Sequence, residues 1–120
     1  MKLCVKEGRY AVARLKAIAD IPREGFMTLS VTEEEISLVC REDQIPACAE
    51  KMETGFSLIK IEGTLDFSLV GIIAKVSGIL TACKIPLFCV STFDTDYFLV
   101  YSDKLEKAID ALAGAGYQIG

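Results

Sequence analysis

One amphipathic stretch, from Asp66 to Lys84, constrains the fold of this chain more than any other feature of its sequence. Apolar residues recur along it with the i, i+3, i+4, i+7 spacing that places side chains on a single face of an α-helix. Asp66 or Ser68 can cap the start, because either side chain can accept hydrogen bonds from the first free backbone N–H groups. We therefore expect a helix whose core-facing stripe consists of Leu69, Ile72, Ile73, Val76, Ile79, Leu80 and Cys83.

The order of elements after residue 55 predicts the fold class. A strand precedes this helix, two strands follow it, and a second helix and a short strand complete the chain. Asp103 and Glu106 have capping-box spacing for the second helix, which Gly114 or Gly116 can end. This is the order of the split βαβ arrangement, in which an antiparallel sheet carries two helices on one face. We therefore expect an α+β fold with strands at 56–61, 87–92, 97–101 and 117–119.

The N-terminal half reads mostly as strands, and part of it resembles the second half. Residues 30–40 and 91–101 match position for position as a strand, an acidic turn and a strand. This favours an internal duplication with a degenerate first copy, although short matches of this kind also arise by chance. Units of about 60 residues are marginal alone, so the two should pack together. The strands are expected at 3–5, 10–15, 26–31 and 36–40, with a helical turn in 47–52.

Charge and composition exclude several classes of function. The net charge of −4 leaves no broad positive field for phosphates, so nucleic acid and anionic membranes are not expected as partners. The most apolar run, Leu69 to Cys83, contains Lys75 and is too short to span a membrane, and the N-terminus does not read as a signal peptide. We therefore expect a cytoplasmic protein. Five cysteines without CxxC spacing, and no histidine, predict reduced and mostly buried thiols, no metal and no cofactor.

Small residues mark the helix side opposite the apolar stripe. A helix with about 100° per residue brings together Gly71, Ala74, Gly78 and Ala82. Each helical glycine costs about 1 kcal/mol relative to alanine, which favours a second helix or a backbone covering this side over mere tolerance at the surface. Gly71 also lies near the helix start, where free N–H groups can bind a carboxylate. The alternative for Gly71 is a packing role.

The predicted turn at 92–96 is the other unusual feature. Thr92, Phe93, Asp94, Thr95 and Asp96 place two carboxylates, two hydroxyls and an aromatic ring between apolar strands. Asp96 can pair with an ammonium or guanidinium group, and Thr92 or nearby carbonyl groups can add hydrogen bonds. The alternative is an ordinary polar hairpin without a ligand.

Three strings carry a resemblance to a known family. They are Glu-Gly-Thr-Leu-Asp-Phe-Ser-Leu-Val-Gly-Ile at 62–72, Ser-Thr-Phe-Asp-Thr-Asp-Tyr-Phe-Leu-Val at 91–100, and Thr-Glu-x-Glu-x-Ser at 32–37. Together they resemble the tandem ACT-domain family of small bacterial proteins and, more distantly, the CASTOR-type arginine sensors. The resemblance implies two ferredoxin-like (βαββαβ) ACT units packed side by side, a degenerate one at 1–54 and a complete one at 55–120.

The same resemblance implies a ligand and a set of contacts. A free amino acid would bind at the interface between ACT units. The sensors contain four such units, and a homodimer of this chain would restore that number. Carried onto matching positions, the contacts are Asp66, Leu69, Val70, Gly71, Thr92, Phe93 and Asp96, with Ser30 and Val31 facing them from the first unit.

The preferred hypothesis is therefore a non-enzymatic, amino-acid-binding regulatory protein. The alternative from another class is an assembly module that dimerises through the small-residue helix side and binds no ligand. A ferredoxin-like enzyme such as an acylphosphatase would need a phosphate cradle and a positioned arginine. None of the arginines lies in a glycine-rich loop, and no histidine is available for acid–base chemistry, so catalysis is not expected.

Overall fold

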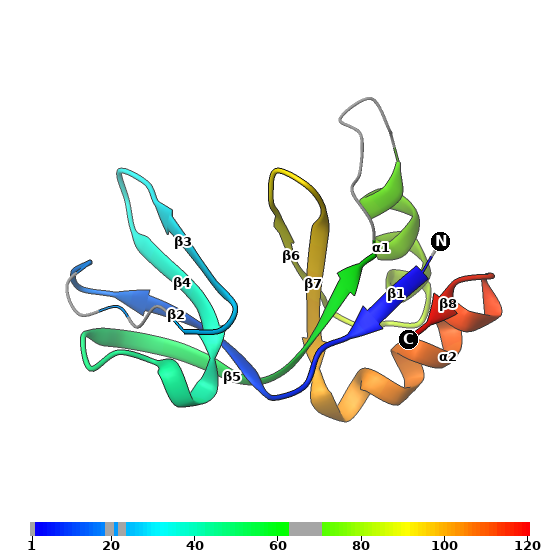
Figure 1. Cartoon of the computed structure of the whole chain (residues 1–120), viewed down its shortest axis with the longest axis horizontal. Coiled ribbons are helices and arrows are strands. Elements are labelled where there is room, and N and C mark those ends of the chain that lie inside the picture. The colour runs from blue at the N-terminus through cyan, green and yellow to red at the C-terminus, as the bar shows by residue number, and fades with distance from the viewer. Residues whose placement is uncertain (1, 19–20, 22–23, 63–70) are drawn as a thin grey trace. The chain divides into compact units, whose positions relative to one another are not determined.

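The computed structural model describes residues 2–18, 21, 24–62 and 71–120, and it divides into two compact units. Unit 1 comprises Met1–Glu7 with Ser57–Gly120, and unit 2 comprises Gly8–Phe56 (Figure 1). The N-terminal strand therefore lies in the same compact unit as residues 57–120. The division of the chain into two ACT-like units stays a prediction. No helix in the described part of the chain is long and apolar enough to cross a membrane.

Unit 1 is a mixed sheet with two helices. In chain order its elements are β1 (Lys2–Val5), the end of β5 (Ala49–Ile61), α1 (Ile72–Ala82), β6 (Phe88–Ser91), β7 (Asp96–Tyr101), the 3₁₀ turn η2 (Ser102–Lys104), α2 (Leu105–Gly114) and β8 (Gln118–Ile119). The strands lie in the order β6-β7-β5-β1-β8. β1 pairs antiparallel with β5, with Leu3 opposite Ile61, and parallel with β8.

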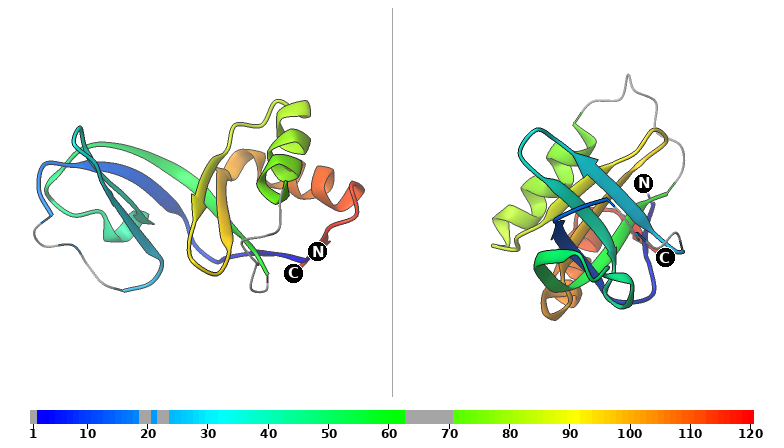
Figure 2. Two further views of the ribbon diagram at one scale, coloured as in Figure 1. Left: turned by 90° about the horizontal axis from the view of Figure 1, so that it is seen from above. Right: turned by 90° about the vertical axis from the view of Figure 1, so that its left-hand side faces the viewer.

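Both helices cover one face of this sheet. Alternate residues of the strands, such as Ile59 and Ile61 of β5, point to the same face and are buried there. They form one cluster with the buried residues of α1 and α2, and Figure 2 shows the two helices beside the strands of this unit. The expected α+β fold is confirmed for this unit. The cluster consists of Leu3, Ile59, Ile61, Val76, Leu80, Ile85, Phe98, Val100, Ala108 and Leu112.

The predicted apolar stripe is confirmed within α1. Val76 and Leu80 are buried, and the other described members pack against the same core. The predicted caps Asp66 and Ser68, and the stripe residue Leu69, lie outside the described residues. The helix ends at Ala82, two residues before the predicted end.

The end of α1 is set by a residue that the sequence reading passed over. Lys84 adopts φ 60°, the left-handed conformation. Its N–H donates to the Thr81 carbonyl at 2.9 Å, and the Ile85 N–H donates to the Leu80 carbonyl at 2.9 Å, which together form a Schellman cap. The motif usually contains glycine at the position of Lys84. Because a lysine occupies it here, the sequence does not indicate that the helix ends in this motif.

α2 ends as expected but begins differently. It stops at Gly114, and Gly116 at φ 103° forms the same kind of cap with the carbonyls of the last turn. The predicted capping box between Asp103 and Glu106 is wrong. The chain first makes the 3₁₀ turn η2, so Lys104 occupies the cap position and no side chain caps the helix.

Unit 2 is a four-stranded antiparallel sheet. Its elements are β2 (Tyr10–Leu15), β3 (Met27–Val31), β4 (Ile36–Arg41), the 3₁₀ turn η1 (Glu42–Gln44) and the first part of β5, in the strand order β3-β4-β2-β5. Among its described residues η1 is the only helical element. One buried cluster consists of Ala13, Leu15, Leu38 and Cys40, and Tyr10, Ala11, Val39 and Phe56 are also buried.

The helical turn expected within 47–52 is wrong. β5 already begins at Ala49, and Met52 pairs with Ala13 of β2. This stretch is mostly exposed and polar, so its own pattern does not indicate a strand. The partner strand supplies the backbone hydrogen bonds that decide its conformation.

The hairpin and the 3₁₀ turn that follows it recur in the two units with an offset of 60 residues. β4 begins at Ile36 and β7 at Asp96, and η1 and η2 begin at Glu42 and Ser102. The sequence match of 30–40 with 91–101 was therefore displaced by one position. The strand order is β3-β4-β2 in unit 2 and β6-β7-β5 in unit 1. In both sheets the first strand of the hairpin is therefore at an edge, its second strand is next, and the strand that precedes the hairpin in the sequence follows. In unit 1, β1 lies between β5 and β8.

Candidate ligand-binding regions

The turn between β6 and β7 is closed by a threonine at its first position. The Thr92 N–H donates to the Thr95 carbonyl at 2.9 Å, and the Thr92 hydroxyl donates to the same carbonyl at 3.0 Å. The Thr95 N–H in turn donates to the Thr92 hydroxyl at 3.4 Å. Such side-chain-to-backbone bonds fix a turn locally. Thr92, Phe93 and Asp94 are exposed on this turn, and the Phe93 side chain is 78% exposed.

The fourth residue of this turn faces the protein interior. Thr95 is 6% exposed, and its hydroxyl donates to the Ile61 carbonyl at 2.6 Å. Ile61 is the last residue of β5. The hydrogen bond therefore joins the turn to the strand end beside it.

Asp96 follows the turn as the first residue of β7 and is half-buried. It lies opposite Ser91 in the β6–β7 ladder. Burial and the negative charge of Asp96 raise the pKa of the Cys89 thiol above its ordinary value of 9.0. The Asp96 carboxylate thus contributes a negative electrostatic potential at the end of the turn.

Gly71 stands directly before α1. Its φ of 79° is a left-handed conformation that disfavours any side chain, and a Cβ atom built there would meet nothing within 4 Å. The Lys75 N–H donates to the Gly71 carbonyl at 2.8 Å, which closes the first helical turn. The left-handed φ accounts for glycine at this position, and the ligand-binding and packing roles of Gly71 both stay predictions. The small side chains of α1 at Ala74, Gly78 and Ala82 are exposed.

The remaining predicted contacts that the structure describes belong to unit 2. Ser30 and Val31 end β3 in unit 2, and both are exposed. Asp66, Leu69 and Val70 lie outside the described residues. The structure therefore brings together Thr92, Phe93 and Asp96, places Gly71 on a separate element of unit 1, and assigns Ser30 and Val31 to the other unit.

The turn between β3 and β4 in unit 2 is built in the same way. The Thr32 N–H donates to the Glu35 carbonyl at 3.0 Å, the Thr32 hydroxyl donates to that carbonyl at 3.3 Å, and the Glu35 N–H donates to the Thr32 hydroxyl at 3.1 Å. Thr32 and Glu35 occupy the positions of Thr92 and Thr95, 60 residues earlier. Glu35, however, is exposed where Thr95 is buried.

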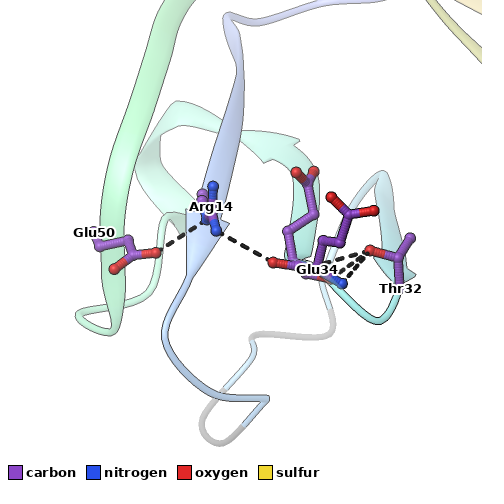
Figure 3. A network of polar contacts seen from close by, with 5 residues as sticks. Arg14, Thr32, Glu34 and Glu50 are labelled. Carbon is purple, nitrogen blue, oxygen red and sulfur yellow. Dashed lines mark hydrogen bonds and ion pairs between the residues drawn. The ribbon is translucent and has the colours of Figure 1, made fainter.

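A groove of about 480 Å³ lies beside the β3–β4 turn. Arg14 lines it, and the sequence patterns did not single out this residue. The Arg14 guanidinium pairs with Glu50, with 3.1 Å between Nε and Oε1, and Nη2 donates to the Glu34 carbonyl at 3.2 Å (Figure 3). These partners meet only through the strand register, so no local pattern could reveal them. The groove is lined by Arg14, Leu15, Lys16, Val31, Thr32, Glu33, Glu34, Glu35, Ile36 and Glu50.

The chemistry open to these regions is binding through charge and hydrogen bonds. In the groove, four carboxylates face two cations, and both partners of the Arg14–Glu50 pair keep more than a third of their side-chain surface exposed. Within the described residues, no group of three or more histidine, cysteine or acidic side chains is arranged to hold a metal.

Comparisons with known proteins relate both parts of the chain to others. Residues 51–114, more than half of the chain, match a family model described as an ACT domain. Residues 8–48 match a second model, described as an N-terminal domain. No curated protein matches the sequence significantly.

Solved structures show the same fold in several proteins. An Agobacterium tumefaciens protein is 38% identical, with a TM-score of 0.89, over 99% of this chain and 91% of its own. A Vibrio cholerae protein of unknown function, described as a possible transport protein, is 21% identical, with a TM-score of 0.75, over 94% of this chain and 88% of its own. An aspartate kinase of Clostridium acetobutylicum, described as an allosteric enzyme, is 14% identical, with a TM-score of 0.68. Its match covers 94% of this chain and 34% of the kinase chain.

Proposed function

Because this chain belongs to the ACT-domain family, we propose that it is a non-enzymatic regulatory protein that binds a free amino acid through unit 1. The binding residues would be those of the β6–β7 turn and the start of α1. The proposal includes the arrangement predicted from the resemblance: tandem ACT units, the first of them degenerate, with the ligand between units and Ser30 and Val31 completing the contacts.

The observation that carries the proposal is the construction of the β6–β7 turn. Its own hydrogen bonds fix the backbone of the turn, so the positions of the exposed Phe93 ring and the Asp96 carboxylate are fixed as well. A preorganised support lowers the entropy lost on binding. The Asp96 charge suits the ammonium group of an amino acid, and the first N–H groups of α1 suit its carboxylate.

The free energies required are modest. A dissociation constant between micromolar and millimolar corresponds to about −8 to −4 kcal/mol. Three or four charge-assisted hydrogen bonds, at about 1.5–3 kcal/mol each, are sufficient after the cost of association. The 60-residue offset between the two hairpins and the common order of their strands support the degenerate ACT unit predicted at 1–54. Five free thiols support the expected cytoplasmic location, because reducing compartments keep cysteines unpaired. The prediction that they are mostly buried is wrong, since only Cys40 is buried.

Calorimetry against each of the twenty amino acids tests the proposal. We expect at least one to bind, and we expect Asp96→Asn to weaken that binding about tenfold, since the variant loses one charge-assisted contact. Asp94→Asn is the matched control, because Asp94 is an exposed carboxylate on the same turn, and its affinity should stay within about twofold of the wild type. The absence of heat for all twenty at millimolar concentration would contradict the proposal.

A second candidate is an assembly module, and it explains the predicted homodimer without a ligand. Two edge strands, β3 and β6, contain no charged residue, which leaves their outer edges without the usual protection against pairing. The exposed small side chains of α1 also allow close approach of another helix.

Sedimentation of helix variants distinguishes this candidate. If α1 forms the dimer contact, Gly78→Gln should yield a monomer, because the added side chain fills the space that the contact needs. Ala113→Gln, an exposed position on α2, should leave the oligomeric state of the wild type unchanged. A monomeric Gly78→Gln variant, together with no heat of binding for any amino acid in calorimetry, would favour the assembly module over the amino-acid sensor.

A further inference from the structure

A single hydroxyl connects the β6–β7 turn to the end of β5 in unit 1. Thr95 is buried at 6% exposure, and its Oγ1 donates a hydrogen bond to the Ile61 carbonyl oxygen at 2.6 Å. The end of β5 is itself held by β1, because the Glu62 N–H donates to the Lys2 carbonyl at 2.9 Å. Thr95 therefore joins the exposed turn to two strands of the sheet.

We propose that Thr95 is a positioning residue of the ligand site, and this inference rests on the function proposed above. The Thr95 hydroxyl does not touch the ligand. It fixes where Phe93 and Asp96 stand relative to the strand that leads to α1, and so it sets the affinity for the amino acid.

Unit 2 shows that the turn does not need this hydrogen bond in order to form. The β3–β4 turn has the same three internal hydrogen bonds, although the residue equivalent to Thr95 is the exposed Glu35. There, Arg14 reaches the turn from β2 and donates to the Glu34 carbonyl at 3.2 Å. Local bonds therefore make the turn in both units, and the contribution of Thr95 is the placement of the turn.

The two connections leave different surfaces open. In unit 2, the guanidinium of Arg14 lies in the groove beside the turn. In unit 1, the connection lies beneath the turn, because Thr95 is buried while Thr92, Phe93 and Asp94 are exposed. Burial also strengthens the connection, since a carbonyl left without a partner in the interior is costly. This arrangement holds the turn firmly and keeps its outer side accessible to a small molecule.

Substitutions at Thr95 test the role directly. Thr95→Val keeps the shape but removes the hydroxyl, and we expect the dissociation constant of the best-binding amino acid to rise about tenfold. Thr95→Ser keeps the hydroxyl and should restore binding to within about threefold of the wild type. Affinity is measured by calorimetry on folded protein at 25 °C, so a loss of global stability alone does not change it.

The matched control is Ser57→Ala. Ser57 is also 6% exposed in unit 1, and its Oγ lies 2.8 Å from Ser102 Oγ, so the variant loses a buried hydroxyl contact away from the turn. It should lower the melting temperature as Thr95→Val does, while its dissociation constant stays within about twofold of the wild type. A merely structural Thr95 would behave like Ser57.

Hydrogen exchange gives a readout that needs no ligand. We expect Thr95→Val to speed exchange of the Glu62 amide about tenfold, because its bond to Lys2 lies at the strand end that Thr95 anchors, while the Thr92 and Thr95 amides, which the local bonds of the turn protect, stay within about twofold of the wild type. Unchanged exchange of the Glu62 amide, or wild-type affinity in Thr95→Val, would overturn the role of Thr95. If the wild-type protein binds none of the twenty amino acids, the proposed function fails, and the role of Thr95 at a ligand site fails with it.

Discussion

Units 1 and 2 contain the same strand order and the same threonine-closed turn, but only unit 1 has α-helices among its described residues. In unit 1, two helices cover the sheet and the buried cluster has members from both of them. In unit 2, no α-helix occurs among the described residues, and the buried apolar residues lie on the strands. The same order of strands therefore occurs both with and without α-helices packed on the sheet. Strand pairing and turn chemistry determine the arrangement of strands, while the helices determine how much core the unit encloses.

The two units also differ in how each turn is attached to the neighbouring strand. In unit 1 the attachment is a buried hydroxyl–carbonyl hydrogen bond from Thr95, and in unit 2 it is the exposed Arg14 with its partner Glu50. Exposed ion pairs weaken in salt, whereas buried neutral hydrogen bonds do not. We therefore expect unit 1 to hold its turn firmly under conditions that loosen the turn of unit 2.

The largest expected effect tests the difference in core. Leu80 of α1 and Leu38 of β4 are both fully buried, so the same substitution compares their surroundings. We expect Leu80→Ala to lower the free energy of unfolding by about 4–5 kcal/mol and Leu38→Ala by about 2–3 kcal/mol, because a site without a described α-helix over it should collapse or admit water more easily. Urea unfolding followed by circular dichroism measures both. A larger loss for Leu38→Ala would break the comparison.

A smaller effect tests the exposed attachment. Arg14→Met keeps much of the side-chain volume and removes the charge, and it should lower the free energy of unfolding by about 0.5–1 kcal/mol. The loss should shrink in about 1 M NaCl, where charges are screened within about 3 Å. Unfolding in low and high salt measures the difference, and Lys51→Met, at an exposed neighbouring position of β5, serves as the control. A loss that does not depend on salt would mean that Arg14 acts through packing.

The smallest effect at neutral pH concerns Cys40 of unit 2 and its counterpart Val100 of unit 1, 60 residues later. Burial, with a smaller contribution from the charge of Asp43, raises the pKa of the Cys40 thiol from 9.0 to about 11. The unfolded chain therefore loses this proton at lower pH than the folded chain. The stability that depends on the neutral thiol is complete below pH 9 and falls as the pH rises toward 11.

Cys40→Val places the residue of unit 1 in unit 2. We expect a change of less than about 1 kcal/mol at pH 7, because both side chains are apolar and similar in size. Between pH 9 and about 11 the wild type should lose stability relative to the variant. Urea midpoints across this range measure the effect. Parallel pH profiles for the two proteins would mean that the thiol ionises equally well in both states.

Local patterns predicted several elements correctly, for physical reasons that lie within the elements themselves. The spacing of Val76 and Leu80 identified α1, because a helix that buries one face must repeat its apolar residues every three or four positions. The β6–β7 turn was found from its polar residues between apolar strands. Of the predicted contacts, Thr92, Phe93 and Asp96 share this turn, and their role in binding stays a prediction.

Other features could not be predicted, because their causes lie elsewhere in the chain. The first part of β5 is polar and exposed, and it is a strand because β2 pairs with it. The Arg14 network depends on the same register. The buried position of Thr95 depends on where the end of β5 lies, and the sequence shows only a threonine in a polar turn.

The amino-acid sequence by itself determined which segments have one apolar face, where the polar turns fall and that the charge is negative, since each of these depends on the order of neighbouring residues. Only the tertiary structure decided that residues 1–7 join the C-terminal unit, that Lys84 ends α1 in a left-handed conformation, and that Thr95 faces inward while Glu35 faces solvent. The physical reason is that a hydrogen bond or a buried contact between distant segments forms only after the strands have set their register, and neither partner reveals the other beforehand.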